Sequence, residues 1–246
     1  MPKPTVDSAY DASAYPPFAV TVDLVIFTIR TGSLQVLLVE RGGAPFAGRL
    51  ALPGGFVQPD EGLDEAATRE LAEETGIDLR AAKASRPEQL ATYGATGRDP
   101  RMRVVTVAHV ALLADLPDPT AGSDAAGAAL VDVEVALRKR LAFDHRMILR
   151  DGLDRVRAKL EYTSIATRFC PAEFTLGELR RVYEAVWGVE LDPGNFRRKI
   201  LASGMVVEVP GTPKASGPGG GRPAAQYRAA SAVPVAIDPP FRRPGD

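Results

Sequence analysis

Three glutamates with helical spacing are the side chains in this chain that most clearly could do chemistry. Glu70, Glu73 and Glu74 stand at positions i, i+3 and i+4, which places them on one face of a helix. Adjacent carboxylates repel one another, and a hard divalent cation such as Mg²⁺ removes that repulsion while also binding phosphate oxygens. The spacing therefore predicts a metal site formed by all three, with Glu73 and Glu74 as catalytic groups if the site is active.

The residues around these glutamates favour a bound phosphate compound over a merely solvated acidic helix. Gly54 and Gly55 allow a ligand to approach the backbone closely. Arg69 can pair with a carboxylate such as Glu61 and so hold the preceding loop onto the helix. An acidic face that only meets water is the alternative, because runs of charge are usually exposed.

A second polar cluster, near the C-terminus, is basic. In the segment Asn195–Leu201 (NFRRKIL), the pattern predicts that Phe196, Ile200 and Leu201 are buried. The side chains left exposed are candidates for contacts with DNA bases and phosphates, namely Asn195, Arg197, Arg198 and Lys199. Arg180 and Arg181, on a preceding helix, could contact phosphates, and a solvated basic face is the alternative.

The elements that must position the glutamates read as a mixed α/β domain. Strand and helix signals fall in a regular order. We expect strands over 18–29, 34–39, 50–57 (interrupted at Pro53-Gly54-Gly55) and 103–114, helices over 61–75 and 144–160, and a loop over 116–129.

The basic cluster lies in a different context. Thr175 and Glu178 form a capping box that opens a helix ending at Gly188. Asp192 and Pro193 open a second helix, which ends near Ser203. A strand over 205–209, a Gly/Pro-rich loop over 210–224 and a returning strand over 226–229 follow. Helix, short turn, helix and hairpin is the order of a winged helix-turn-helix.

Length and composition agree with this division. With 246 residues, the chain suits one medium and one small domain. We expect a tail over 1–17, an α/β domain over 18–160 that includes the connecting helix 144–160, a winged helix over 161–232 and a tail over 233–246. Residues 1–160 carry 19 Lys and Arg against 22 Asp and Glu, whereas residues 161–246 carry 11 against 9. This mild asymmetry has the sign that DNA binding by the second domain requires.

The sequence also indicates where the protein works. A single cysteine, Cys170, excludes an internal disulfide and is compatible with a reducing compartment. The N-terminus lacks the apolar stretch of a signal peptide, and no apolar run is long enough to span a membrane. We therefore expect a cytoplasmic protein.

The segment 55–77 resembles the Nudix signature. Its fixed positions are Gly55, five residues, Glu61, seven residues, Arg69-Glu70-Leu71, one residue, Glu73-Glu74, one residue and Gly76-Ile77. Chance agreement at so many fixed positions is negligible. The resemblance implies an α/β/α sandwich over about 18–140. In active members it also implies Mg²⁺-dependent hydrolysis of a nucleoside diphosphate linked to another group.

The whole chain is similar to the Nudix-related transcriptional regulators of NAD metabolism, the NrtR family. The segments that carry the likeness are GRDPR (97–101), LAFDH (141–145), FTLGELRRVYEAVWG (174–188) and LDPGNFRRKIL (191–201). The resemblance implies a homodimeric repressor that binds a palindromic double-stranded DNA operator near NAD biosynthesis genes and is released by ADP-ribose. In such a protein the effector would contact Arg49, Gly54, Gly55 and Arg69.

Hydrolysis remains an alternative function because the Nudix signature is intact. ADP-ribose pyrophosphatases usually carry a catalytic glutamate in a later loop, yet no glutamate occurs between Gln89 and Val133. Glu134 follows directly, beyond that loop. A metal site without a positioned base binds its ligand but cleaves it slowly. The sequence thus favours a sensor with weak or absent turnover over a plain hydrolase whose C-terminal module only dimerises.

Overall fold

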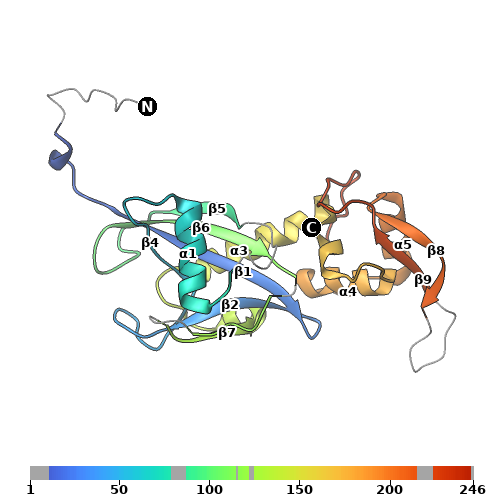
Figure 1. Ribbon diagram of the computed structural model, residues 1–246, viewed down its shortest axis with the longest axis horizontal. Coiled ribbons are helices and arrows are strands. Elements are labelled where there is room, and N and C mark those ends of the chain that lie inside the picture. Colours follow the sequence, from blue (N-terminus) through green and yellow to red (C-terminus); the bar gives the residue numbers. More distant parts are fainter. Residues whose placement is uncertain (1–10, 79–86, 115, 122–124, 215–223, 245–246) are drawn as a thin grey trace.

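The computed structural model describes residues 11–78, 87–114, 116–121, 125–214 and 224–244. Within these residues, an N-terminal sheet domain is joined by one long helix to a smaller C-terminal domain (Figure 1). The expected N-terminal tail falls largely outside the described residues, apart from a short 3-10 turn, η1 (Ala12–Ala14).

A mixed sheet forms the centre of the first domain. Its strands are β1 (Ala19–Arg30), β2 (Ser33–Arg41), β3 (Leu50–Ala51), β4 (Gly54–Phe56), β5 (Glu88–Tyr93), β6 (Val104–Leu112) and β7 (Ala125–Asp132). The main path runs β3-β2-β1-β6-β5, with β4 paired to β1 and β7 paired to β2. Strands β1 and β6 are parallel, and the other pairs are antiparallel.

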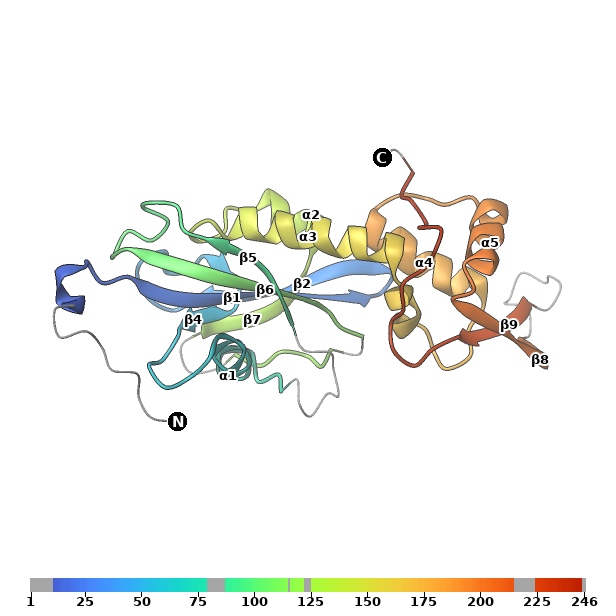
Figure 2. The same ribbon diagram turned by 90° about the horizontal axis from the view of Figure 1, so that it is seen from above.

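Helices cover both faces of this sheet, which confirms the expected α/β/α sandwich. Helix α1 (Leu63–Thr75) lies on one face, whereas α2 (Val133–Arg138) and α3 (His145–Tyr162) lie on the other (Figure 2). Gly76 ends α1 with a φ of 69°, a left-handed conformation that glycine adopts at little cost. The side chain of Leu71 is buried under α1 and that of Ile148 under α3, so each face has its own apolar core.

The second domain has the predicted helix-turn-helix and hairpin. Its elements are η2 (Ser164–Phe169), α4 (Leu176–Trp187), α5 (Pro193–Ala202), β8 (Val206–Lys214) and β9 (Ala224–Ala229). The capping box forms as expected, because the backbone N–H of Glu178 donates to the Thr175 hydroxyl and that of Thr175 to the Glu178 carboxylate. Asp192 caps α5 by accepting from the N–H of Asn195.

The two domains are packed together through α3. Its first turns cover the sheet, where Gly152 lies against Val25 closely enough that a larger residue would be tight. Toward its other end, the Arg157 carbonyl accepts a hydrogen bond from the indole N–H of Trp187 on α4. Buried side chains on the α3 face of the sheet and those of the second domain form one continuous cluster.

Three expectations about loops and burial within residues 18–232 differ from the structure. The predicted loop 116–129 contains most of β7, whose alanine- and glycine-rich sequence has weak strand propensity but pairs with β2. The predicted loop 210–224 is shortened by the extension of β8 to Lys214, and residues 215–223 lie outside the described residues. Leu201, expected to be buried, is 41% exposed, because the helical period turns it away from the face of Phe196 and Ile200.

The C-terminal segment was expected to be a tail, yet part of it packs into the second domain. Ile237 and Phe241 are buried, and the backbone N–H of Phe241 donates to the Glu161 carbonyl. The Phe241 ring lies 5.1 Å from that of Trp187 and 5.5 Å from that of Phe196. Residues before and after the hairpin therefore share one core.

Candidate functional site

A cavity of about 810 Å³ opens between the β-sheet and α1. This volume lies in the range of roughly 300–1,000 Å³ that is typical of small-molecule sites. Its walls carry polar and charged side chains from β1, β2, β4, α1 and the two loops before β6 and α3. The predicted residues Gly54, Gly55, Arg69, Glu70, Glu73 and Glu74 all line it.

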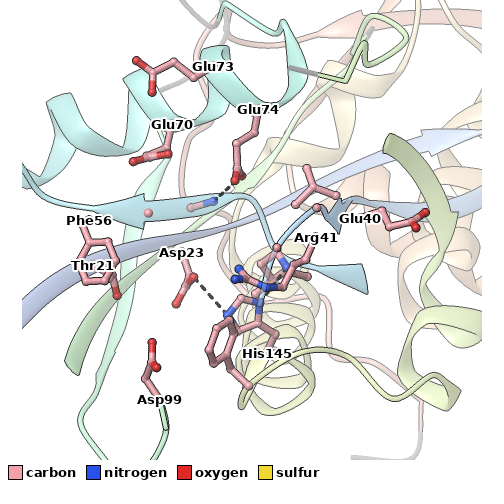
Figure 3. A pocket seen from close by; sticks show the side chains of 18 of the residues that line it. Thr21, Asp23, Glu40, Arg41, Phe56, Glu70, Glu73, Glu74, Asp99 and His145 are labelled. Atoms are coloured by element: carbon pink, nitrogen blue, oxygen red, sulfur yellow. Dashed lines mark hydrogen bonds and ion pairs between the residues drawn. The ribbon is translucent and has the colours of Figure 1, made fainter. Parts of the chain in front are cut away.

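Two of the three predicted glutamates face the inside of this cavity (Figure 3). Glu74 accepts a hydrogen bond from the backbone N–H of Gly54 at 2.9 Å. Burial raises the pKa of Glu74 to about 7 and also raises the pKa of Glu70. A carboxyl group that is held in poor contact with water is stabilised as an anion by a nearby cation.

Gly55 is required because of Glu70. A Cβ at position 55 would overlap the Glu70 carboxylate, so only glycine leaves that carboxylate in place. The sequence expects a ligand to approach the backbone at Gly55, and in the described structure the group that lies against Gly55 is the Glu70 carboxylate.

Arg69 fixes the loop before α1, as the sequence predicts. Its guanidinium donates to Glu61 through Nε at 3.0 Å and through a terminal nitrogen at 2.6 Å. This pair lowers the pKa of Glu61 to about 2. Arg69 also donates to Glu70 at 2.8 Å and to Glu73 at 2.9 Å, so it neutralises part of the acidic face.

The glutamates do not form the three-ligand group that the spacing suggested. Glu73 is 56% exposed and bonded to Arg69, and it points away from Glu74 and Asp23 in Figure 3. Across the described ranges, no three carboxylate, histidine or cysteine side chains are clustered as metal ligands. Mg²⁺ typically takes one or two carboxylates and completes its shell with water and phosphate oxygens, and Glu70 and Glu74 fit that role.

Of the two basic side chains predicted at the ligand, Arg69 lines the cavity and Arg49 does not. The guanidinium of Arg49 lies over the Phe46 ring at 5.0 Å. Arg41, Arg98 and Arg101, which the sequence did not single out, also line the cavity. Three guanidinium groups opposite two carboxylates suit a ligand that carries several negative charges and a divalent cation.

Arg98 belongs to a buried network that reaches the start of α3. Its side chain, 4% exposed, donates to Asp144 at 2.7 and 3.0 Å and to Asp23 at 3.2 Å. His145, the first residue of α3, accepts from the Leu52 N–H at 2.9 Å through Nδ1. Its Nε2 therefore carries the proton and faces Asp23 at 3.4 Å, while burial lowers the pKa of the imidazole.

Aromatic rings form another part of the wall. Phe143 has a φ of 49°, an uncommon conformation for a bulky residue and one that tends to occur at functional sites. Its ring contacts Phe46 edge-on at 4.9 Å and lies 4.9 Å from the Arg41 guanidinium. The rings and guanidinium planes present flat surfaces on which a planar base can stack.

Sequence reasoning missed most of this network, although signals were present. Asp23 is the one charged residue in the apolar run 18–29, and such a residue in a buried strand calls for a partner. Arg98 and Arg101 fall in GRDPR and His145 in LAFDH, two segments that carry the family likeness. The sequence expects packing or capping of His145, and its burial agrees with packing.

No glutamate beyond α1 approaches the cavity within the described residues. Glu134 lies in the first turn of α2, where its carboxylate is 3.8 Å from Arg157. The acidic side chain that the later loop does supply is Asp99, which accepts from Arg101 at 2.7 and 3.0 Å. Asp115 and Asp124 lie outside the described residues.

The predicted DNA-binding residues divide into different environments. Asn195, Arg197, Arg198 and Lys199 are all exposed on α5. Arg198 donates to the Asn195 side chain at 2.8 Å, and Arg197 to the Tyr227 hydroxyl of the hairpin at 3.1 Å. Lys199 lies on the other flank, 5.0 Å from the Phe241 ring.

The two arginines of α4 also differ. Arg181 is exposed, whereas Arg180 is partly buried. The guanidinium of Arg180 donates to the Leu191 carbonyl at 3.4 Å and lies 3.4 Å from Glu184. Arg180 therefore holds the turn between α4 and α5, and Arg181 is better placed for a phosphate.

Comparisons with known proteins agree with both halves of this description. The NUDIX domain family model matches residues 17–152, and the model of the NrtR DNA-binding winged helix domain matches residues 166–229. The ADPR responsive transcriptional repressor NtrR of Acinetobacter baylyi is 38% identical over 221 residues, which are 89% of this chain and 85% of that protein.

Two solved structures are also similar. Shewanella oneidensis NrtR in complex with a 27mer DNA is 31% identical with a TM-score of 0.66, and the match covers 85% of this chain and 93% of that one. The NUDIX domain of the same protein in complex with ADP ribose is 34% identical with a TM-score of 0.55, covering 61% of this chain and 95% of that one.

Each helix in the described ranges is too short or too polar to cross a membrane.

Proposed function

Because the chain belongs to the NrtR family, with a Nudix domain followed by an NrtR-type winged helix, we propose that it represses genes of NAD biosynthesis or salvage and is released from DNA by ADP-ribose. The observation that carries this proposal is the presence, in one chain, of an arginine- and glutamate-lined cavity and a second helix of a helix-turn-helix with exposed Arg197 and Arg198. As a regulator of transcription it would work in the compartment that holds the DNA, which agrees with the cytoplasmic location expected from the sequence.

The cavity suits ADP-ribose in charge and shape. The diphosphate would lie near Gly54 and Gly55, and the carboxylates of Glu70 and Glu74 would hold a Mg²⁺ ion that neutralises part of its charge. Arg41 and Arg101, at the wall of the cavity, supply planar groups that bind phosphate oxygens in pairs. Arg69 would not contact the ligand directly. It supports the site by holding the carboxylates of Glu61 and Glu70 in place.

Helix α3 contacts the cavity wall at one end and the DNA-binding domain toward the other, so it could transmit a change between them. At its N-terminus, Arg98 ties the capping residue Asp144 to Asp23 in the cavity wall. At its far end, Arg157 donates to the Val186 carbonyl of α4 and accepts from Trp187. A ligand that draws Arg98 toward its phosphates would alter the start of α3 and so the placement of the winged helix.

DNA release follows if the ligand favours a position of the winged helix in which the two copies of α5 no longer match the spacing of the operator. An operator has half-sites at a fixed spacing, so two copies of α5 must present their arginines at that spacing. We propose that the protein binds a palindrome as a homodimer, whose two-fold symmetry matches that of the site. ADP-ribose shifts the equilibrium only if it binds the DNA-free arrangement more tightly.

The first test measures operator binding with and without ADP-ribose. In a mobility-shift experiment, the protein should bind specifically to a DNA fragment from upstream of its own gene. ADP-ribose with Mg²⁺ should weaken that binding by about 5- to 150-fold, the usual range of allosteric coupling. Gly55→Ala should bind the operator but lose this response, because the added methyl group displaces the Glu70 carboxylate.

Gly43→Ala is the matched control. Gly43 also lines the cavity, but a Cβ there would meet no atom within 4 Å. This variant should respond to ADP-ribose as the wild type does. Calorimetry that detects ADP-ribose binding to wild-type protein, together with unchanged operator affinity, would refute the coupling. No salt-sensitive DNA binding at all would refute the repressor function.

Hydrolysis is the second candidate because the Nudix signature is complete and Glu70 and Glu74 line the cavity. The carboxylate beyond α1 that lines the cavity, Asp99, accepts two hydrogen bonds from Arg101 and is therefore a poor general base. We therefore expect ADP-ribose to be bound with weak or absent turnover.

The turnover prediction is checked by measuring AMP released from ADP-ribose with Mg²⁺. Release well below one turnover per second is expected. Sustained turnover of several per second would make the protein a pyrophosphohydrolase, and the C-terminal domain would then serve for dimerisation.

A further inference from the structure

The hydroxyl of Tyr227 makes an unusual contact for a buried side chain. Tyr227 lies on β9, in the hairpin beside α5 (Figures 1 and 2), and is 1% exposed. Its hydroxyl oxygen accepts a hydrogen bond from a terminal nitrogen of Arg197, at 3.1 Å. A buried core residue of the hairpin therefore holds an exposed side chain of the helix that we propose contacts DNA.

Both the backbone and the ring of Tyr227 are held in place by the surrounding domain. Its backbone N–H donates to the Phe174 carbonyl at 2.8 Å, and its own carbonyl accepts from the Phe174 N–H at 2.8 Å. Its neighbour in the hairpin register is Glu208 on β8. With backbone and ring both held by packing, the hydroxyl has one position relative to α5, so its bond limits where the Arg197 guanidinium can lie.

The other basic residues of α5 are held differently. Arg198 bonds to Asn195 on the same exposed helix surface, and Lys199 is directed to the flank of Phe241. Neither contact ties the side chain to a buried polar atom of another element. Arg197 is therefore the cation on α5 that the hairpin positions.

On these grounds, and resting on the proposed DNA-binding function, we infer that Tyr227 is a positioning residue that orients Arg197 for reading a base. A guanidinium has five N–H donors in one plane, so one bond to a hydroxyl leaves a pair free for the O6 and N7 acceptors of guanine. Holding the plane before binding removes rotamer freedom that would otherwise be lost on the DNA.

Tyr227→Phe tests this role, because it removes the hydroxyl and keeps the ring. We expect the affinity for the operator to fall about tenfold, the effect of losing one hydrogen bond to a charged group. Affinity for a DNA of unrelated sequence should change much less, since phosphate attraction does not require an oriented arginine. The ratio of specific to nonspecific affinity is thus the readout that a purely structural hydroxyl would not alter.

Tyr183→Phe is the matched control. Tyr183 is equally buried in the same domain, and its hydroxyl contacts the Met205 sulfur at 3.8 Å, not an arginine. This variant should keep the specificity ratio. If Tyr227 acts through Arg197, Tyr227→Phe should have no further effect on operator affinity in an Arg197→Ala background, measured at low salt.

The outcomes separate this inference from the proposed function. Wild-type protein that shows no preference for its upstream region overturns the repressor function, and the role of Tyr227 falls with it. Specific binding by wild type, with an unchanged ratio in Tyr227→Phe, overturns the positioning role alone. An equal loss in the single variant and in the Arg197→Ala background would also overturn it, because Tyr227 would then act independently of Arg197.

Discussion

Replacing Arg197 by alanine should lower the affinity of the protein for its operator by about 100-fold or more. A bidentate arginine–guanine contact contributes about 1–3 kcal/mol of discrimination, and a symmetric operator would lose one such contact in each half-site. Arg197 is exposed on α5, so its removal leaves the packing of Phe196 and Ile200 intact. Fluorescence anisotropy with labelled operator and unrelated DNA measures the loss.

Arg140→Ala is the control for charge. Arg140 is exposed in the first domain, after α2, and its substitution also removes one positive charge per chain. We expect operator affinity to stay within a few-fold of wild type, and ADP-ribose binding to be unchanged in both variants. Operator affinity in Arg197→Ala that equals that of Arg140→Ala would show that α5 does not read the DNA through this residue.

The second large effect concerns stability. Phe241→Ala should lower the free energy of unfolding of the C-terminal domain by about 3–5 kcal/mol, the usual cost of truncating a buried phenylalanine. Phe241 is buried against Tyr183, Trp187 and Phe196, with ring centroids 5.1 to 5.5 Å apart. Trp187 is the only tryptophan in the chain, so its fluorescence during urea unfolding reports on this core directly.

Val233→Ala is the matched control for Phe241→Ala. Val233 lies in the same C-terminal segment but is 61% exposed, and its substitution should change stability by no more than about 0.5 kcal/mol. A Phe241→Ala transition that coincides with the wild type would mean that the segment does not contribute to the core. The prediction concerns only the transition reported by Trp187, because two domains can unfold separately.

Several features follow from the sequence alone, because they depend on local patterns. The spacing of Glu70, Glu73 and Glu74 fixes their common helix face, and the cap residues Thr175 and Asp192 fix where α4 and α5 begin. The order of strand and helix signals was sufficient for a mixed α/β domain and the winged helix, whereas the sandwich was implied by the family likeness. Family likeness over Gly55–Ile77 added the ligand class.

The tertiary structure decided which charged residues meet. Asp23, Arg98 and His145 come from distant parts of the chain, and only the parallel pairing of β1 with β6 and the close packing of α3 bring them to one cavity. Arg49 was expected at the ligand, but its guanidinium lies over the Phe46 ring. Sequence distance does not indicate the direction in which a side chain points.

Strand β7 and the C-terminal segment also depend on tertiary contacts more than on local sequence. The sequence of β7 carries little strand propensity, and its pairing with β2 supplies the backbone hydrogen bonds that make it a strand. Phe241 lies in a proline-rich segment with no regular pattern, yet it completes the aromatic core of the winged helix. Local propensity thus determined most of the helices and strands, with α2 and β5 not expected from the sequence. Long-range pairing and burial determined the cavity, the β7 edge and the contact between Tyr227 and Arg197.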